Sequence, residues 1–172
     1  MMYESLLKKK KLIFMAVLLF TSSWSSANNI EINTLIKAAK QGEIEAQANL
    51  GSAYLFGDYD QETNYKKAAY WSERAAQQGD ASSQYNLAIM YFRGMGVKQN
   101  LEKAFHYYQQ AAEQGHTDAQ IQLALRYLYA EGTPQNVELA HQWYIKVKQS
   151  DTADLTQFIQ EFEESYERIR TK

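Results

Sequence analysis

Three histidines are the first candidates for acid–base or metal chemistry in this chain of 172 residues. They are His106, His116 and His141, and the chain contains no cysteine. Helical metal sites commonly place a second ligand one turn away from the first, and none of these histidines has a histidine or cysteine at that distance. We therefore expect all three to be surface or edge residues rather than ligands or catalytic bases.

A short acidic run is the second candidate. Asp58, Asp60 and Glu62 alternate like the first ligands of a calcium-binding loop, but the sixth position is not glycine and the twelfth is Ala69. We interpret the run as a solvated acidic turn. The sequence also lacks a phosphate-binding glycine loop, a nucleophile elbow and a paired-carboxylate motif. These absences favour a protein that is not an enzyme and needs no metal or cofactor.

A glycine spacing reveals how the chain is organised. Gly42, Gly79 and Gly115 recur after 37 and then 36 residues, and similar side chains follow each of them at nearly the same offsets. A repeat of this length predicts a solenoid of stacked helix pairs. The residues shared by the three units include Gln47, Gln84 and Gln120, Leu50, Leu87 and Leu123, and Tyr54, Tyr91 and Tyr127.

The second half of each unit has the spacing of a second helix. Ala68, Ala104 and Ala140 are each followed after three residues by an aromatic side chain, and after seven by another small or apolar residue. Spacings of three, four and seven place side chains on one helical face. The small residues predict close helix contacts, and the glycines after the second helices predict left-handed helix ends.

At these residues the chain resembles the Sel-one-like repeat family, relatives of the tetratricopeptide repeats. The second unit carries the pattern most fully, whereas the first lacks the second glycine of its loop and the third has Ala130 in place of the first. The resemblance implies an all-α, right-handed superhelix of three helix pairs with a half-repeat at each end. It also implies protein–protein scaffolding. The cysteine pairs of family members associated with β-lactams are missing, so that activity is not carried over.

The expected organisation has six parts: a signal peptide at 1–27, a capping helix at 28–42, repeats at 43–79, 80–115 and 116–150, and a capping helix at 151–172. The leader combines Lys8 to Lys11 with a short apolar run and small residues before Ala27, where we expect cleavage. A retained membrane anchor is the alternative. The C-terminal helix has an apolar stripe that favours a cap over a partner-binding helix.

The charge balance and the leader together narrow the expected partners and location. Removal of residues 1–27 takes Lys8 to Lys11 and Glu4 from totals of 18 basic and 20 acidic residues, which leaves a net charge of −5. An acidic protein is a poor candidate for nucleic-acid binding. We therefore expect a periplasmic or secreted bacterial protein that contacts other proteins, and that contacts a membrane only through an uncleaved leader.

The concave face is the expected binding surface, because in related superhelices the first helix of each pair lines it. Aligning the units on Leu50, Leu87 and Leu123 leaves a stripe of mostly apolar, non-consensus side chains. Such a stripe suits a peptide or helix laid along the groove. The predicted contact residues are Ser52, Leu55, Phe56, Tyr85, Ile89, Phe92, Arg93, Ile121, Leu125, Leu128 and Tyr129.

Three functions follow from this surface, in decreasing order of preference. The first is a non-catalytic adaptor of the bacterial cell envelope that binds a partner peptide or protein. The second is an immunity protein that neutralises a lipase-type toxin in the periplasm. The third is a cell-wall-related hydrolase, which requires polar groups such as Glu45, Arg93, Asp118 and a histidine to converge in one deep cleft. Burial of the stripe by neighbouring helices is the structural alternative.

Overall fold

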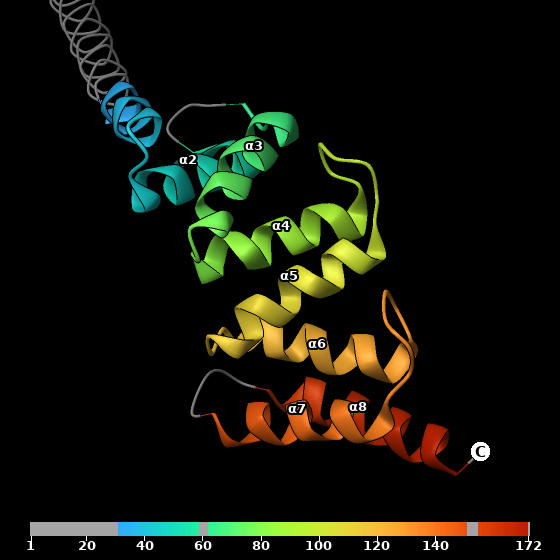
Figure 1. Ribbon diagram of the computed structural model, residues 1–172. Helices are drawn as coiled ribbons and strands as arrows, with labels where there is room; N and C mark the ends of the chain where they lie inside the picture. The colour runs from blue at the N-terminus through green and yellow to red at the C-terminus, as the bar shows by residue number, and fades with distance from the viewer. Residues whose placement is uncertain (1–30, 59–61, 151–154, 172) are drawn as a thin grey trace, which may run out of the picture.

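The computed structural model describes residues 31–58, 62–150 and 155–171, and these residues form α-helices and turns without a strand. Residues 31–40 are helical. The helices that follow are α2 (Ile44–Phe56), α3 (Tyr65–Gln77), α4 (Ala81–Arg93), α5 (Leu101–Glu113), α6 (Thr117–Tyr129), α7 (Val137–Gln149) and α8 (Thr156–Arg170). Figure 1 shows them stacked one pair above the next. The predicted all-α superhelix of helix pairs is confirmed.

The pairs are α2 with α3, α4 with α5, and α6 with α7, and each pair also contacts the next. The helical segment 31–40 lies at the N-terminal end of the stack and α8 at the C-terminal end. The predicted leader at 1–27 lies outside the described residues. Within the described ranges, no helix is both long enough and apolar enough to cross a bilayer.

The turns between pairs are three-residue connections that satisfy the helix ends. Gly79, at φ +95°, follows α3, and the backbone N–H of Asp80 donates to the Ala75 carbonyl at 3.1 Å. The Asp80 side chain then caps α4 by accepting the backbone N–H of Ser83 at 2.6 Å. Gly42 and Gly115 also have positive φ, so the predicted left-handed ends of the second helices are confirmed.

Small residues allow the helices of a pair to approach closely. Ala68, Ala104 and Ala140 are all buried. Gly51 of α2 faces Ser72 of α3, and a Cβ at Gly51 would lie 2.6 Å from the Ser72 hydroxyl oxygen and 3.0 Å from its backbone nitrogen. Only glycine fits this crossing, which confirms the predicted role of the small residues.

A glutamine near the start of each first helix joins consecutive helices, and in α2 and α4 it is buried. The Gln84 side chain on α4 donates to the Ala76 carbonyl at the end of α3 at 3.2 Å, and its oxygen accepts from the Gln114 side chain after α5 at 2.7 Å. Gln47 makes the same pair of bonds, to Ala39 at 3.0 Å and from Gln78 at 2.7 Å. These bonds fix the position of each pair relative to the one before it.

The long loops of the second and third pairs also pack on the preceding pair. A Cβ at Gly96 would overlap the backbone carbonyl of Tyr65 at the start of α3. A Cβ at Gly132 would overlap the carbonyl of Leu101 at the start of α5 in the same way. The second glycine of each loop is therefore needed for a contact between repeats rather than for the turn alone.

The C-terminal helix covers the last pair with its apolar face. Phe162 of α8 is fully buried and stacks on Tyr144 of α7, with ring centroids 4.6 Å apart. Glu163 accepts the Tyr144 hydroxyl and pairs with Lys148 at 3.0 Å. These two hydrogen bonds lower the pKa of the Glu163 carboxyl. In the described residues, α8 therefore packs as a helix that closes the stack.

One helix end departs from the glycine rule. Gly57 and Gly94 end α2 and α4 in the left-handed conformation, but α6 ends at Ala130, which adopts φ 59°. A residue with a Cβ is strained there by about 1–2 kcal/mol. The missing glycine of the third unit is thus a local defect that the repeat tolerates without a change of helix geometry.

We predict that Ala130→Gly raises the free energy of unfolding by about 0.5–1 kcal/mol, because the relief of strain exceeds the extra entropy of glycine in the unfolded chain. Urea denaturation measures the change. Gly94→Ala is the matched control and should lower stability, because Gly94 has φ +70°, where a side chain is strained. The added Cβ would meet only ordinary contacts, the nearest at 3.5 Å, so backbone strain is the only cost. A loss of stability in Ala130→Gly would contradict the strain.

Candidate functional site

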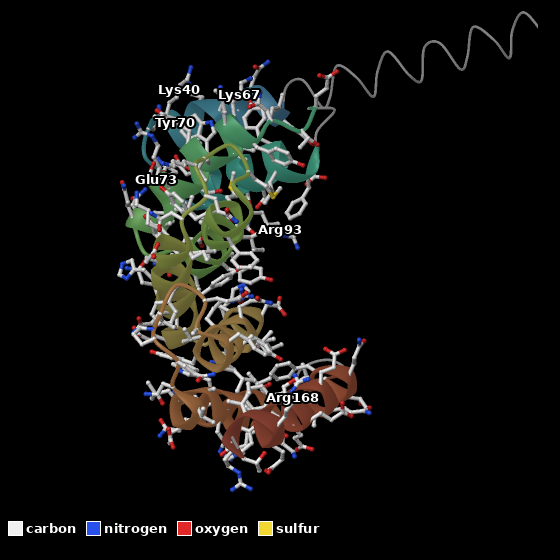
Figure 2. The ribbon with its side chains drawn as sticks, turned by 90° about the vertical axis from the view of Figure 1, so that its right-hand side faces the viewer. Lys40, Lys67, Tyr70, Glu73, Arg93 and Arg168 are labelled. Carbon is white, nitrogen blue, oxygen red and sulfur yellow. The ribbon has the colours of Figure 1, made fainter. Side chains whose placement is uncertain are left out.

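The face that we predict to be concave is built from equivalent positions on α2, α4 and α6. Leu50, Leu87 and Leu123 point into the core and are almost fully buried, which confirms the alignment of the three units. Phe56, Arg93 and Tyr129 are the last residues of these three helices, and all three are exposed. Phe56 has 68% of its surface exposed and Tyr129 has 45%. Figure 2 shows Arg93 on the side toward which α8 projects.

Two predicted contact residues are buried and are removed from this surface. Leu55 is 7% exposed because it packs with Met90 of α4 in the core cluster formed around α2 and α3. Leu128 is 0% exposed because Phe162 of α8 and Tyr144 of α7 belong to the cluster around it. We call the remaining set the concave stripe. It consists of Ser52, Phe56, Tyr85, Ile89, Phe92, Arg93, Ile121, Leu125 and Tyr129.

Most side chains of the concave stripe are half-buried rather than fully exposed. Tyr85, Ile89 and Phe92 of α4 pack on the central core cluster, and Leu125 of α6 packs on the cluster that α8 completes. Ser52 accepts from the Asn86 side chain at 3.4 Å. The structural alternative therefore holds in part, because the stripe is partly covered, while its rim at Phe56, Arg93 and Tyr129 stays open.

Tyr85 lies in the middle of this face, and Tyr108 of α5 belongs to the core cluster on which Tyr85 packs. Tyr85 stacks on His116 with ring centroids 4.6 Å apart, and its ring is 5.9 Å from that of Tyr108. Burial raises the pKa of Tyr108 to about 12, although the nearby positive charge of Arg126 opposes the rise. Burial also raises the pKa of Tyr85, with a further contribution from the Asp118 carboxylate. Tyr85 is half-buried and can donate a hydrogen bond to a partner, whereas Tyr108 is buried in the core.

Arg126 of α6 is a functional candidate that the sequence reasoning missed. Its side chain is 8% exposed, pairs with Glu131 and donates to Gln122 at 2.7 Å. The guanidinium lies 4.1 Å from the centre of the Phe92 ring and 5.9 Å from that of Tyr108. Its Nε has no hydrogen-bond partner although it is buried. The residues at the same position in the first and second repeats are Ala53 and Met90. A charged residue at a position that is apolar in the other repeats was therefore the sequence signal that could have identified Arg126.

The three histidines have structural surroundings. His116 caps α6, because its Nδ1 accepts the backbone N–H of Ala119 at 3.4 Å. His141 stacks on Tyr166 of α8 at 4.8 Å, and His106 is exposed beside Gln110. Among the residues that the structure describes, no three His, Asp or Glu side chains gather as metal ligands. Asp60 of the acidic run lies outside these residues.

The hollows of the molecule do not join the polar groups that a hydrolase would need. The groove between residues 31–40 and α2 has a volume of about 580 Å³ and includes Glu45, but neither Arg93 nor Asp118. A hollow of about 250 Å³ between α7 and α8 contains His141 and Glu163. There Glu163 is already bonded to Tyr144 and Lys148, so neither hollow assembles the cleft expected for the hydrolase alternative.

We predict that Arg126→Met leaves the free energy of unfolding within about 1 kcal/mol of the native value or raises it. Methionine fills this position at Met90, and the change removes a buried, unsatisfied Nε while the partly exposed Glu131 remains hydrated. Arg126→Ala is the comparison and should cost about 2–4 kcal/mol, since it uncovers Phe92 and Tyr108. Equal losses in both variants, measured by urea denaturation, would show that the charge itself is needed for stability.

Comparison with protein families matches the Sel1 repeat at residues 44–80, 81–116 and 117–146. Each matched segment begins one residue after the boundary expected from the glycine spacing. The chain is also 40% identical over 52 residues to the ERAD-associated E3 ubiquitin-protein ligase component HRD3B of Arabidopsis thaliana. That match covers 30% of this chain and only 9% of the plant protein.

Solved structures show the same architecture. A Sel1 repeat protein from Oxalobacter formigenes has a TM-score of 0.63 at 28% identity, over 67% of this chain and 88% of that one. Helicobacter pylori cysteine rich protein B gives 0.59 at 20% identity, over 77% and 95%. The Escherichia coli protective antigen c5321 gives 0.55 at 24% identity, over 80% and 36%. The last two likenesses concern the fold alone.

The repeat matches account for most of the described chain, and the helix pairs, the glycine ends and the solved structures agree with them. Repeats of this type generally act as scaffolds for protein–protein interaction and typically form non-catalytic adaptors. By its sequence and by its structure, this chain belongs to the Sel1 repeat family.

Proposed function

We propose that the chain is a non-catalytic adaptor that binds a segment of a partner protein along the concave stripe. The observation that carries this proposal is the row of exposed side chains at the ends of α2, α4 and α6. Phe56 and Tyr129 expose large apolar surfaces on either side of Arg93. Exposed aromatic and arginine side chains on one face are typical of protein interfaces, where they contribute most of the binding energy.

The stripe is suited to a partner segment with apolar side chains and hydrogen-bond acceptors. Arg93 forms no ion pair with another described residue, so its charge is available to a partner carboxylate or carbonyl. The hydroxyl of half-buried Tyr85, which is protonated at neutral pH, supplies a further donor. Apolar contacts along the rim would supply affinity, and these donors would fix the orientation of the segment.

The proposed place of action is the periplasm or the outside of the cell, after the leader has been removed by cleavage between Ala27 and Asn28. The basic and apolar leader in the sequence supports this location. The choice between an envelope scaffold and an immunity protein depends on the partner. The concave stripe serves both, and the immunity role would require a toxin as the bound protein. The scaffold is preferred because it needs no property beyond those of the repeat family.

The test is recovery of a partner from a detergent-solubilised envelope fraction by the protein from Asn28 onward. We predict that Phe56→Ser with Tyr129→Ser loses the partner, each change costing about 2 kcal/mol of binding free energy. Both side chains are exposed, so the fold should not change. N-terminal sequencing of protein from the periplasm should also begin at Asn28.

The matched control is Tyr65→Ser with Tyr70→Ser, which removes two exposed aromatic side chains from α3. This control should retain the partner at the native level. Equal recovery by the concave variant and the native protein would remove the concave stripe as the binding site.

A further inference from the structure

A basic and aromatic patch lies on the face opposite the concave stripe, at the first end of the stack. Lys66, Tyr70 and Arg74 follow one another at intervals of one helical turn on α3, and Lys37 and Lys40 lie on the helical segment 31–40. All five are exposed. Figure 2 shows Lys40 and Tyr70 together on one side of the molecule, with Glu73 on the same side, and Arg93 on the other. We call these five residues the convex basic patch.

The centre of this patch is a preformed hollow. Lys40, Tyr70, Trp71 and Arg74 are among the residues that line a cavity of about 260 Å³ between the end of the first helical segment and α3. The Arg74 guanidinium lies 4.4 Å from the centre of the Tyr70 ring, which holds the cation in place. None of the patch cations forms an ion pair with another described residue. The hollow is therefore positively charged and open to an anionic group.

The other repeats show that the solenoid does not need these charges. In the second repeat, the positions of Lys66 and Arg74 are occupied by Glu102 and Gln110. Lys40, two residues before Gly42, corresponds to Gln77 before Gly79. In the third repeat, Lys66 is again replaced by a carboxylate, Glu138, whereas the position of Arg74 keeps a cation, Lys146. Side chains that differ between otherwise equivalent helices do not take part in the packing contacts that those helices have in common. The combination of cations that forms the convex basic patch is therefore particular to the N-terminal end of the stack.

We propose that the convex basic patch docks the protein on the surface of a bilayer that contains anionic phospholipids. The net charge of residues 28–172 is −5, so attraction to an anionic surface must come from a local concentration of cations such as this one. The cations spread over the convex side of two helices rather than along a groove, which suits a broad, flat surface better than a peptide. The hollow accepts one lipid phosphate, which Lys40 and Arg74 contact together.

The aromatic side chains of this region support the same partner. Tyr70 is 49% exposed, and Tyr65 at the start of α3 is also exposed. Tyrosine has an apolar ring and a polar tip, and it is typical of membrane–water interfaces. Because the patch and the concave stripe lie on opposite sides, a protein docked by the patch leaves the stripe free for its partner. The docking does not depend on the identity, or the existence, of that partner.

The test is binding to vesicles by the protein from Asn28 to Lys172. This protein contains all three core clusters. It lacks the apolar leader, which could enter a bilayer by itself and obscure the result. We expect co-sedimentation with phosphatidylcholine vesicles that contain phosphatidylglycerol, and none with phosphatidylcholine alone. The triple variant Lys40→Gln, Lys66→Gln, Arg74→Gln should bind roughly 100-fold more weakly, about fivefold for each cation removed.

The matched control is Lys98→Gln, Lys146→Gln, Arg168→Gln, which has the same net charge as the patch variant and should bind within about twofold of the native protein. Circular dichroism and thermal unfolding verify that both variants keep the fold. Three results would overturn the proposal: no binding to the anionic vesicles, equal losses in patch variant and control, or equally tight binding of soluble polyglutamate, which would indicate an acidic protein as the partner.

Discussion

The glutamine near the start of each first helix, buried in α2 and α4, is the interaction on which the stacking of the pairs depends. Gln84 contacts the ends of both neighbouring second helices, so that three consecutive helices meet at one side chain. Each such bond contributes about 1 kcal/mol net, and it acts only at one distance and one orientation. Apolar burial drives the helices together, whereas the glutamine determines how far each pair is shifted along the next. In the third repeat the counterpart of Gln114 is Ser150, and α8 closes the stack there.

Because the shared residues are committed to this packing, function must reside at positions that differ between repeats. Such positions fall on two opposite faces. On the concave side, Phe56, Arg93 and Tyr129 share one helix position and yet are an aromatic, a cation and an aromatic. On the convex side, Lys66 and Arg74 of the first repeat have no basic counterpart in the second. A solenoid with two such faces can hold a partner and a surface at the same time, which is what an adaptor requires.

The local parts of this structure could be predicted from the sequence and the non-local parts could not. Glycine spacing and the three-four-seven pattern depend on neighbours in the chain, so the helix pairs and their left-handed ends were predicted. The burial of Leu55 and Leu128 depends on the next pair and on α8, which a single-repeat alignment does not contain. Arg126 could not be predicted as a candidate because its position in the repeat is a core position, occupied by Ala53 and Met90 in the other units. The convex basic patch was missed because net charge averages over both faces.

The central claim, that the buried glutamines couple the pairs, is tested most directly by native-state amide hydrogen exchange in Gln84→Leu. The substitution keeps a side chain of similar bulk and removes the bonds to Ala76 and from Gln114. Loss of about 1–2 kcal/mol at this one boundary should make the amides of residues 31–40, α2 and α3 exchange roughly tenfold faster, while those of α6, α7 and α8 keep their native rates. Unchanged exchange, or the same acceleration in every helix, would contradict the coupling.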